Sequence, residues 1–211
     1  MATLAEEQKK IYLLGISGSP RIGSTDYIVR EALNYAKTKF QDIAIEIDYF
    51  TAHKKKLNFC IHCDYCVREK KGCIHKDDMN ELYPKLIKAN AYIIGSPVYQ
   101  GTISGQLKVI IDRTRALVAA DPDVFKNKLG IAIAVGGDRV GGQESTIHAI
   151  LDFYVLNGII PVSGGFFGAN LGGTIWSKDK GAIGAQEDEE GIRTVHRSVN
   201  KLIKLATKIL L

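Results

Sequence analysis

The feature that most constrains the fold of this chain is the alternation of short apolar runs with segments of helical periodicity. Apolar runs typical of buried strands occur at residues 10–17, 43–50, 91–95, 129–135 and 159–162. Apolar residues recur at helical spacing over residues 24–37, 77–89, 104–118, 143–156 and 187–210. This alternation predicts a parallel sheet with helices on both faces.

Five strands joined by right-handed crossovers form a doubly wound α/β sheet, and the strand order 2-1-3-4-5 is the flavodoxin-like arrangement. The 211 residues, 45% of them hydrophobic, suffice for one core, so we expect a single domain over residues 1–211. We expect two insertions, a cysteine-containing segment at 53–76 after the second strand and an irregular glycine-rich loop at 163–185. Phe166, Phe167 and Trp176 of this loop would be poorly placed in solvent, which predicts a subunit contact.

The loop that follows the first strand has the composition of an anion site. Residues 15–25 read GISGSPRIGST, and hydroxyls, glycine amides and a helix N-terminus together suit a phosphate. Gly18 and Gly23 have the spacing of a nucleotide-binding P-loop, but Ser24 stands where the lysine is required. The loop also lacks a G-x-G-x-x-G fingerprint. Ser24 or Thr25 as a simple helix cap would leave the other polar residues unexplained, so a monophosphate such as that of FMN is the preferred ligand.

Two further loops are expected at the same edge of the sheet. The third strand ends in GSPVYQG at 95–101, and the fourth ends in GGDRVGGQE at 136–144. Ligands of open α/β sheets bind outside the carboxyl ends of the strands. Each loop alone reads as an ordinary turn, but three loops at one edge predict a site for a planar ring, with Tyr99 beside it.

All four cysteines of the chain fall within one short segment, with the spacing C-x2-C-x2-C-x6-C. They are Cys60, Cys63, Cys66 and Cys73. The two x2 gaps between the first three cysteines resemble those of ferredoxin clusters, which favours a [4Fe–4S] centre held by four thiolates, although the last gap is six residues rather than three. Zinc is an alternative because His62 and His75 lie nearby. Disulfides or inert thiols are the remaining alternatives.

The charge of the chain is concentrated in the same segment. Between residues 53 and 76 there are seven lysines and arginines against two acidic residues, which equals the net charge of +5 of the whole chain. A solvated lysine-rich loop would look the same, but cations stabilise a negatively charged cluster and attract an acidic electron carrier. Basic residues confined to one loop do not indicate nucleic-acid binding.

The chain contains no apolar run long enough to span a membrane, and its N-terminal residues lack the pattern of a signal peptide. We therefore expect no membrane association and a cytoplasmic location.

These motifs together resemble the iron–sulfur flavoproteins, a branch of the NADPH-dependent FMN reductase-like superfamily with the flavodoxin fold. The resemblance lies in residues 18–25, the four cysteines, residues 95–113 and residues 136–144. It implies FMN in the three loops, a [4Fe–4S] cluster on the cysteines, and a homodimer or homotetramer. The residues that it implies for the FMN phosphate and its loop are Ser17, Ser19, Arg21, Gly23, Ser24 and Thr25. The residues that it implies for the flavin ring are Pro97, Val98, Tyr99, Gln100, Gly136, Gly137, Asp138 and Gly141.

The resulting hypothesis is an FMN-dependent oxidoreductase with no catalytic side chain. It would pass electrons from a one-electron, ferredoxin-like donor through the cluster to FMN, and on to a small two-electron acceptor. The alternative is an NAD(P)H-dependent FMN or quinone reductase whose cysteines bind zinc or nothing. A redox sensor without turnover is a third hypothesis.

Overall fold

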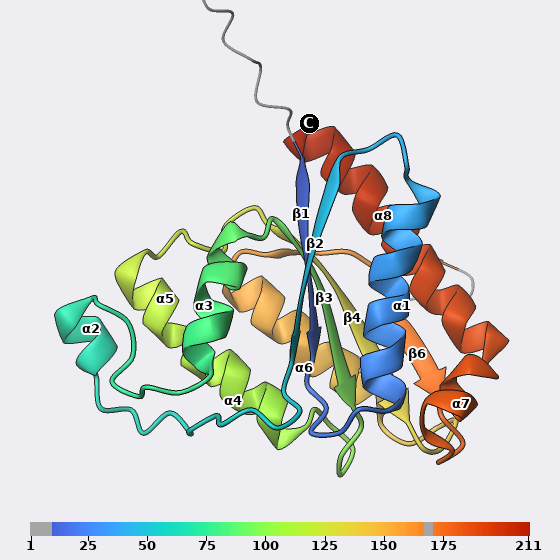
Figure 1. The fold of residues 1–211 in the computed structure, drawn as a ribbon, viewed down its shortest axis with the longest axis horizontal. Helices are drawn as coiled ribbons and strands as arrows, with labels where there is room; N and C mark the ends of the chain where they lie inside the picture. The colour runs from blue at the N-terminus through green and yellow to red at the C-terminus, as the bar shows by residue number, and fades with distance from the viewer. Residues whose placement is uncertain (1–9, 167–170) are drawn as a thin grey trace, which may run out of the picture.

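The computed structural model describes residues 10–166 and 171–211. The expectations that concern residues 1–9 and Phe167 lie outside this part of the chain. A parallel sheet stands between two layers of helices (Figure 1). The strands of the described part are β1 (Ile11–Ser17), β2 (Ile45–Thr51), β3 (Ala91–Pro97), β4 (Leu129–Gly136), β5 (Ile160–Pro161) and β6 (Gly173–Trp176). The order β2-β1-β3-β4-β5 confirms the flavodoxin-like prediction.

The helices divide between the two faces of the sheet (Figure 1). One face is covered by α1 (Ser24–Lys39), α7 (Gly181–Gln186) and α8 (Glu189–Leu210), and the other by α3 (Met79–Lys88), α4 (Gly105–Arg113), α5 (Arg115–Ala120) and α6 (Gln143–Leu156). Successive residues of a strand point to opposite faces, so Leu13 packs in the core under α1 and α8, while Leu14 packs in the core under α3 and α6. Both layers are apolar, which explains why the strands read as continuous apolar runs.

The helix predicted over 104–118 is divided in two. The hydroxyl of Thr114 donates to the carbonyl of Ile111 at 2.7 Å, and its backbone N–H is shared between Ile110 and Ile111. This tight turn separates α4, which ends at Arg113, from α5, which begins at Arg115.

The prediction of an irregular loop at 163–185 is wrong, because this stretch contains β6 and α7. β5 pairs only with Leu129 and Gly130 at the start of β4, and β6 pairs with residues 133–136 at its end. The two short strands therefore share the fifth position of the sheet and satisfy the outer hydrogen-bonding edge of β4. A Cβ on Gly173 would lie 2.6 Å from the Val195 side chain, so this glycine allows α8 to approach the sheet rather than marking a loop.

Trp176 is half-buried within its own chain, because Arg139 and Lys178 lie 4.5 Å and 5.3 Å from the centre of its ring. Trp176 therefore no longer supports a subunit contact, which stays a prediction based on Phe166, whose exposed fraction is 79%. None of the helices in the described residues has both the length and the apolar character to cross a membrane.

Candidate functional site

The carboxyl ends of β1, β3, β4 and β6 meet around a cavity of about 230 Å3. This is the edge of the sheet at which α1 begins (Figure 1). The cavity is lined by Ser19, Arg21, Ile22, Gly23, Ser24, Thr25, Pro97, Val98, Tyr99, Val135, Gly137, Ser177, Asp179 and Gly181. Parallel strands bring their carboxyl ends together, and for this reason loops far apart in the sequence form one site.

Most of the residues expected for the phosphate and the ring lie in this lining. Those brought together are Ser19, Arg21, Gly23, Ser24, Thr25, Pro97, Val98, Tyr99 and Gly137. Ser17, Gln100, Gly136, Asp138 and Gly141 are not among the lining residues of the described chain. Ser17 and Gly136 are buried in their strands, whereas the other three lie at exposed loop tips.

At one end of the cavity, the start of α1 presents groups of the kind that bind a phosphate. Among the described residues, no side chain caps this helix at Gly23, so the first-turn amides keep their hydrogen-bonding capacity. Ser24 and Thr25 line the cavity at that point. The Ser19 hydroxyl instead bonds within the loop, accepting from the Arg21 N–H at 3.1 Å and donating to the Arg21 carbonyl at 2.9 Å. Ser19 therefore shapes the loop, while the helix start offers the anion-binding groups.

The loop after β3 turns back sharply beside the cavity. Tyr99 and Thr102 pair across a two-residue turn in which Gln100 and Gly101 have φ of 49° and 80°, the pattern of a type I′ turn. A Cβ on Gly142, whose φ is 114°, would lie 2.7 Å from Cα of Gly101. The two loops thus touch through glycine backbones, and a side chain at Gly142 would separate them.

The loop after β4 is held by Gln143, which the sequence prediction did not assign to the site. Its Nε2 donates to the Asp138 carbonyl at 2.6 Å, and its Oε1 accepts from the Gly141 N–H at 2.9 Å. The side chain is 6% exposed. A polar residue at the first position of a helix, directly after two glycines, was the available signal for this role.

The sequence analysis also did not assign Ser177 and Asp179, which follow β6, to the site. Ser177 donates through both its N–H and its hydroxyl to the Gly136 carbonyl, at 2.8 Å and 3.0 Å. The carboxylate of Asp179 rests against Gly137, where any Cβ would collide with it. These residues reach the cavity only because β6 ends at the same edge of the sheet. The sequence analysis treated this stretch as an irregular loop and therefore did not place them there.

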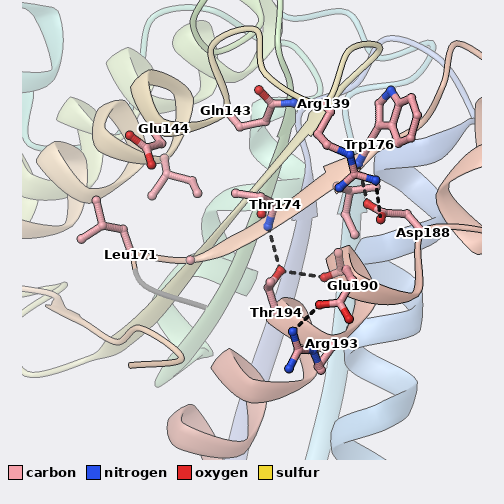
Figure 2. A pocket seen from close by; sticks show the side chains of 14 residues that line it. Arg139, Gln143, Glu144, Leu171, Thr174, Trp176, Asp188, Glu190, Arg193 and Thr194 are labelled. Carbon is pink, nitrogen blue, oxygen red and sulfur yellow. Dashed lines mark hydrogen bonds and ion pairs between the residues drawn. The ribbon is translucent and has the colours of Figure 1, made fainter. Parts of the chain in front are cut away.

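A second cavity of about 290 Å3 is lined by residues of the loop after β4, of β6 and of the start of α8, among others (Figure 2). Figure 2 shows Arg139 between Trp176 and Asp188, with the guanidinium 3.9 Å from the Asp188 carboxylate. Asp188 is 4% exposed and also accepts from the backbone N–H of Trp176 at 2.7 Å. Arg139 is therefore held by its own chain and is not among the residues that line the first cavity.

The cysteine segment leaves the carboxyl end of β2 and crosses to the layer of α3, α4 and α5 (Figure 1). It contains the short helix α2 (Tyr65–Glu69), with left-handed backbone at His62, Asp64 and Lys70. Cys60 and Cys63 are exposed, whereas Cys66 and Cys73 are half-buried and pack against the core. All four are free thiols.

Two arginines of the α4–α5 junction hold this segment. The guanidinium of Arg113 bonds Asp77 at 2.8 and 3.1 Å and the Asn58 carbonyl at 2.6 Å. Burial alone would raise the pKa of Asp77, but the hydrogen bonds from Arg113 and Asn58 outweigh burial and lower that pKa to about 2.

Arg115 bonds Asp64 at 2.6 Å on the surface. Its pKa is raised, first by the Asp64 carboxylate and to a smaller extent by the thiols of Cys66 and Cys60. Arg115 therefore carries its positive charge beside two of the four cysteines.

The donor chemistry of the segment fits an iron–sulfur cluster. No three histidine, cysteine or acidic side chains of the described residues converge as ligands of a single metal ion. A cluster is wider than one ion and takes four thiolates, which this segment carries. In addition, Arg113 Nε and His75 Nε2 are buried without a hydrogen-bond partner in the described chain, and both belong to the surroundings of the cysteines. The Arg113 Nε–H is a buried donor, which suits a sulfur-rich group that brings acceptors.

The strand order and the cavity at the carboxyl edge define a flavodoxin-like α/β protein with a small-ligand site at its switch point. Residues 11–173 match the family described as NADPH-dependent FMN reductase. The chain is 53% identical over 193 residues to an iron–sulfur flavoprotein of Methanocaldococcus jannaschii, covering 92% of this chain and 96% of that protein. It is 49% identical over 197 residues to an iron–sulfur flavoprotein of Archaeoglobus fulgidus, covering 93% and 98%.

The chain therefore belongs to the iron–sulfur flavoproteins of the NADPH-dependent FMN reductase family, and the predicted resemblance is confirmed. As a member, it is an FMN-dependent oxidoreductase.

Solved structures support the fold alone. The protein RosB, solved with 8-demethyl-8-formylriboflavin-5′-phosphate, has a TM-score of 0.67 at 14% identity, covering 95% of this chain and 82% of that one. A WrbA-like flavodoxin of Agrobacterium tumefaciens has a TM-score of 0.64 at 12% identity, covering 94% and 99%.

Proposed function

We propose that the protein accepts single electrons from an acidic, ferredoxin-like carrier at the cysteine segment and delivers them in pairs to a small-molecule acceptor at the FMN cavity. The observation that carries this proposal is the basic segment with four thiols, two of them exposed, joined by one helix to the loops of the cavity. The Ser104 hydroxyl at the start of α4 donates to the Gly18 carbonyl at 2.6 Å, and Arg113 at its end holds the cysteine segment.

When bound, FMN supplies two-electron transfer, and the cluster supplies one-electron transfer. The amides at the start of α1 and the hydroxyls of Ser24 and Thr25 suit the phosphate of FMN. Val98 and Tyr99 line the same cavity and would flank the ring. At about 230 Å3 the cavity is smaller than most sites that enclose a small molecule, so the far end of FMN would extend beyond its rim.

The four cysteines would hold a [4Fe–4S] cluster as thiolates. Purification without oxygen, with iron, sulfide, zinc and flavin quantified per chain, tests this assignment. We expect about four irons and four sulfides for each FMN, together with broad cluster absorption. Stoichiometric zinc without sulfide would contradict the proposal.

The proposal of an acidic electron donor rests on the positive charge of the cysteine segment. The segment from residue 53 to 76 carries a net charge of +5, and its lysines at 70, 71 and 76 are exposed. A positively charged surface of this kind accelerates association with an acidic protein, and the acceleration falls as the ionic strength rises. The double variant Lys71→Glu, Lys76→Glu should slow reduction by a ferredoxin roughly tenfold or more at low salt. The matched control is Lys201→Glu with Lys204→Glu on α8, which should leave the rate unchanged.

A second candidate function is an NAD(P)H-dependent FMN or quinone reductase, because the matched family is described by its use of NADPH. Anaerobic stopped-flow reduction of the bound flavin distinguishes the two functions. Fast reduction by NADPH and none by reduced ferredoxin would favour this second candidate, whereas the reverse would favour the first.

A further inference from the structure

Arg113 has an environment that is unusual for an arginine. Its side chain is 1% exposed, and it makes a two-pronged ion pair with Asp77, whose side chain is 0% exposed. Burying two charges is costly unless their geometry is good and further hydrogen bonds satisfy them. Such a pair at the end of a surface-layer helix requires an explanation beyond the stability of that helix.

The partners of Arg113 are the two ends of the cysteine segment. Asn58, whose carbonyl it bonds, stands two positions before Cys60, and Asp77 stands four positions after Cys73. Asp77 in turn accepts from the backbone N–H and the side-chain amide of Asn58, at 2.8 and 2.9 Å. One buried guanidinium thus closes the segment into a loop that contains all four thiols.

One donor of this guanidinium is left over. Arg113 Nε is buried and has no hydrogen-bond partner among the described residues. A buried N–H of a charged group without a partner is energetically costly, so native proteins seldom leave one unpaired. Cys73 is the nearest of the four cysteines in sequence to Asp77, the ion-pair partner of Arg113, and it is half-buried against the core.

We propose that Arg113 is the positioning residue of the iron–sulfur site: it closes the segment from Asn58 to Asp77 around the cysteines, and its Nε–H donates to the sulfur of Cys73 when that thiolate is a cluster ligand. This inference rests on the cluster assignment of the proposed function. A hydrogen bond and a nearby cation both stabilise the more negative, reduced state of a thiolate-bound cluster and raise its potential. Arg113 therefore acts on the cluster through Cys73 and through the shape of the loop.

The same helix gives this role a geometric consequence. Ser104, the N-cap of α4, bonds the phosphate loop through the Gly18 carbonyl, and Arg113 is the last residue of α4. Nine helical residues span about 13.5 Å. Arg113 thus ties the cysteine loop to a rigid element that also holds the flavin loops of the same chain.

The test compares Arg113→Lys and Arg113→Gln with Arg193→Lys, a control at an arginine that is 55% exposed on α8. All are purified without oxygen, and iron, sulfide and FMN are measured per chain. The midpoint potential of the cluster is measured by a redox titration followed by electron paramagnetic resonance. Arg113→Lys keeps the positive charge beside Asp77 but removes the Nε–H and the paired Nη donors. We therefore expect that the cluster is retained and that its midpoint potential is more negative than in the wild type. Arg113→Gln should lose iron to a chelator roughly tenfold faster or more.

Several outcomes would overturn the proposal. Wild-type potential and wild-type iron retention in Arg113→Lys would refute the role of Nε. Loss of FMN and of the folded circular dichroism signal in both Arg113 variants would assign Arg113 to the general core instead. A wild-type protein without iron and sulfide would overturn the cluster assignment as well, so the failure of the proposed function is distinguishable from the failure of this inference alone.

Discussion

The ion pair between Asp77 and Arg113 allows a quantitative prediction for Asp77→Asn. This change keeps the size of the side chain, which is 0% exposed, but leaves the Arg113 charge buried without its counterion. The lowering of the Asp77 pKa from 3.8 to about 2 corresponds to about 2.4 kcal/mol at neutral pH. Removing one partner of a buried pair costs about 3–5 kcal/mol in other proteins. We therefore expect the free energy of unfolding to fall by about 2–4 kcal/mol.

Urea unfolding at pH 7, followed by circular dichroism with FMN in constant excess, measures this loss. For a chain of this length a loss of 3 kcal/mol lowers the melting temperature by about 6–12 °C. The control is Asp123→Asn, since Asp123 is 70% exposed and pairs with Lys126 on the surface. This control should change stability by less than about 0.5 kcal/mol.

The pH dependence gives a second check on the same reasoning. Because the folded-state pKa of Asp77 is lowered, its contribution is present above about pH 4 and is lost as the pH falls towards 2. The difference between the wild type and Asp77→Asn should therefore shrink across this range. A variant as stable as the wild type at pH 7, or a difference that stays constant from pH 7 to pH 2.5, would refute the argument.

Three further predictions concern other parts of the molecule. Gly142→Ala should weaken FMN binding in fluorescence titrations, because its φ of 114° and its close backbone contact exclude a Cβ. Gly158→Ala, where φ is 70° and the added Cβ would lie at an ordinary contact distance of 3.7 Å from Lys126 Cα, should leave binding unchanged. Thr25→Val should weaken FMN binding by on the order of tenfold if its hydroxyl binds the phosphate, whereas Thr38→Val on the exposed face of the same helix should not. Burial lowers the pKa of Lys128 to about 8, so stability should rise as the pH increases from 8 towards 10.5, and Lys128→Met should abolish that rise.

The parts of the site that could be read from the sequence share one property, which is that their signal is local. The phosphate loop combines hydroxyls, glycines and a helix start within a few residues, and Gly23, Ser24 and Thr25 indeed line the cavity. The loop with Val98 and Tyr99 follows a buried strand directly and lies where expected. Strand order followed from the alternation and from the handedness of the crossovers.

The parts that could not be read from the sequence depend on pairing between distant segments. β6 has only four residues, and it is a strand because the end of β4 offers it hydrogen bonds. Ser177 and Asp179 join the cavity as a consequence of that pairing. Glycines that looked like loop residues, such as Gly173, turned out to permit close packing against a helix. Propensity and composition carry no information about such contacts.

The cysteine segment shows the division most clearly. The sequence by itself determined the number and spacing of the thiols, the positive charge around them and their place after the second strand, because these are properties of neighbouring residues. Only the tertiary structure decided that Arg113, forty residues after Cys73, closes the segment onto α4. The physical reason is that a buried charge must find its partner in space, so the folded core selects the pairing of Arg113 with Asp77 from many arginines and carboxylates that the sequence does not distinguish.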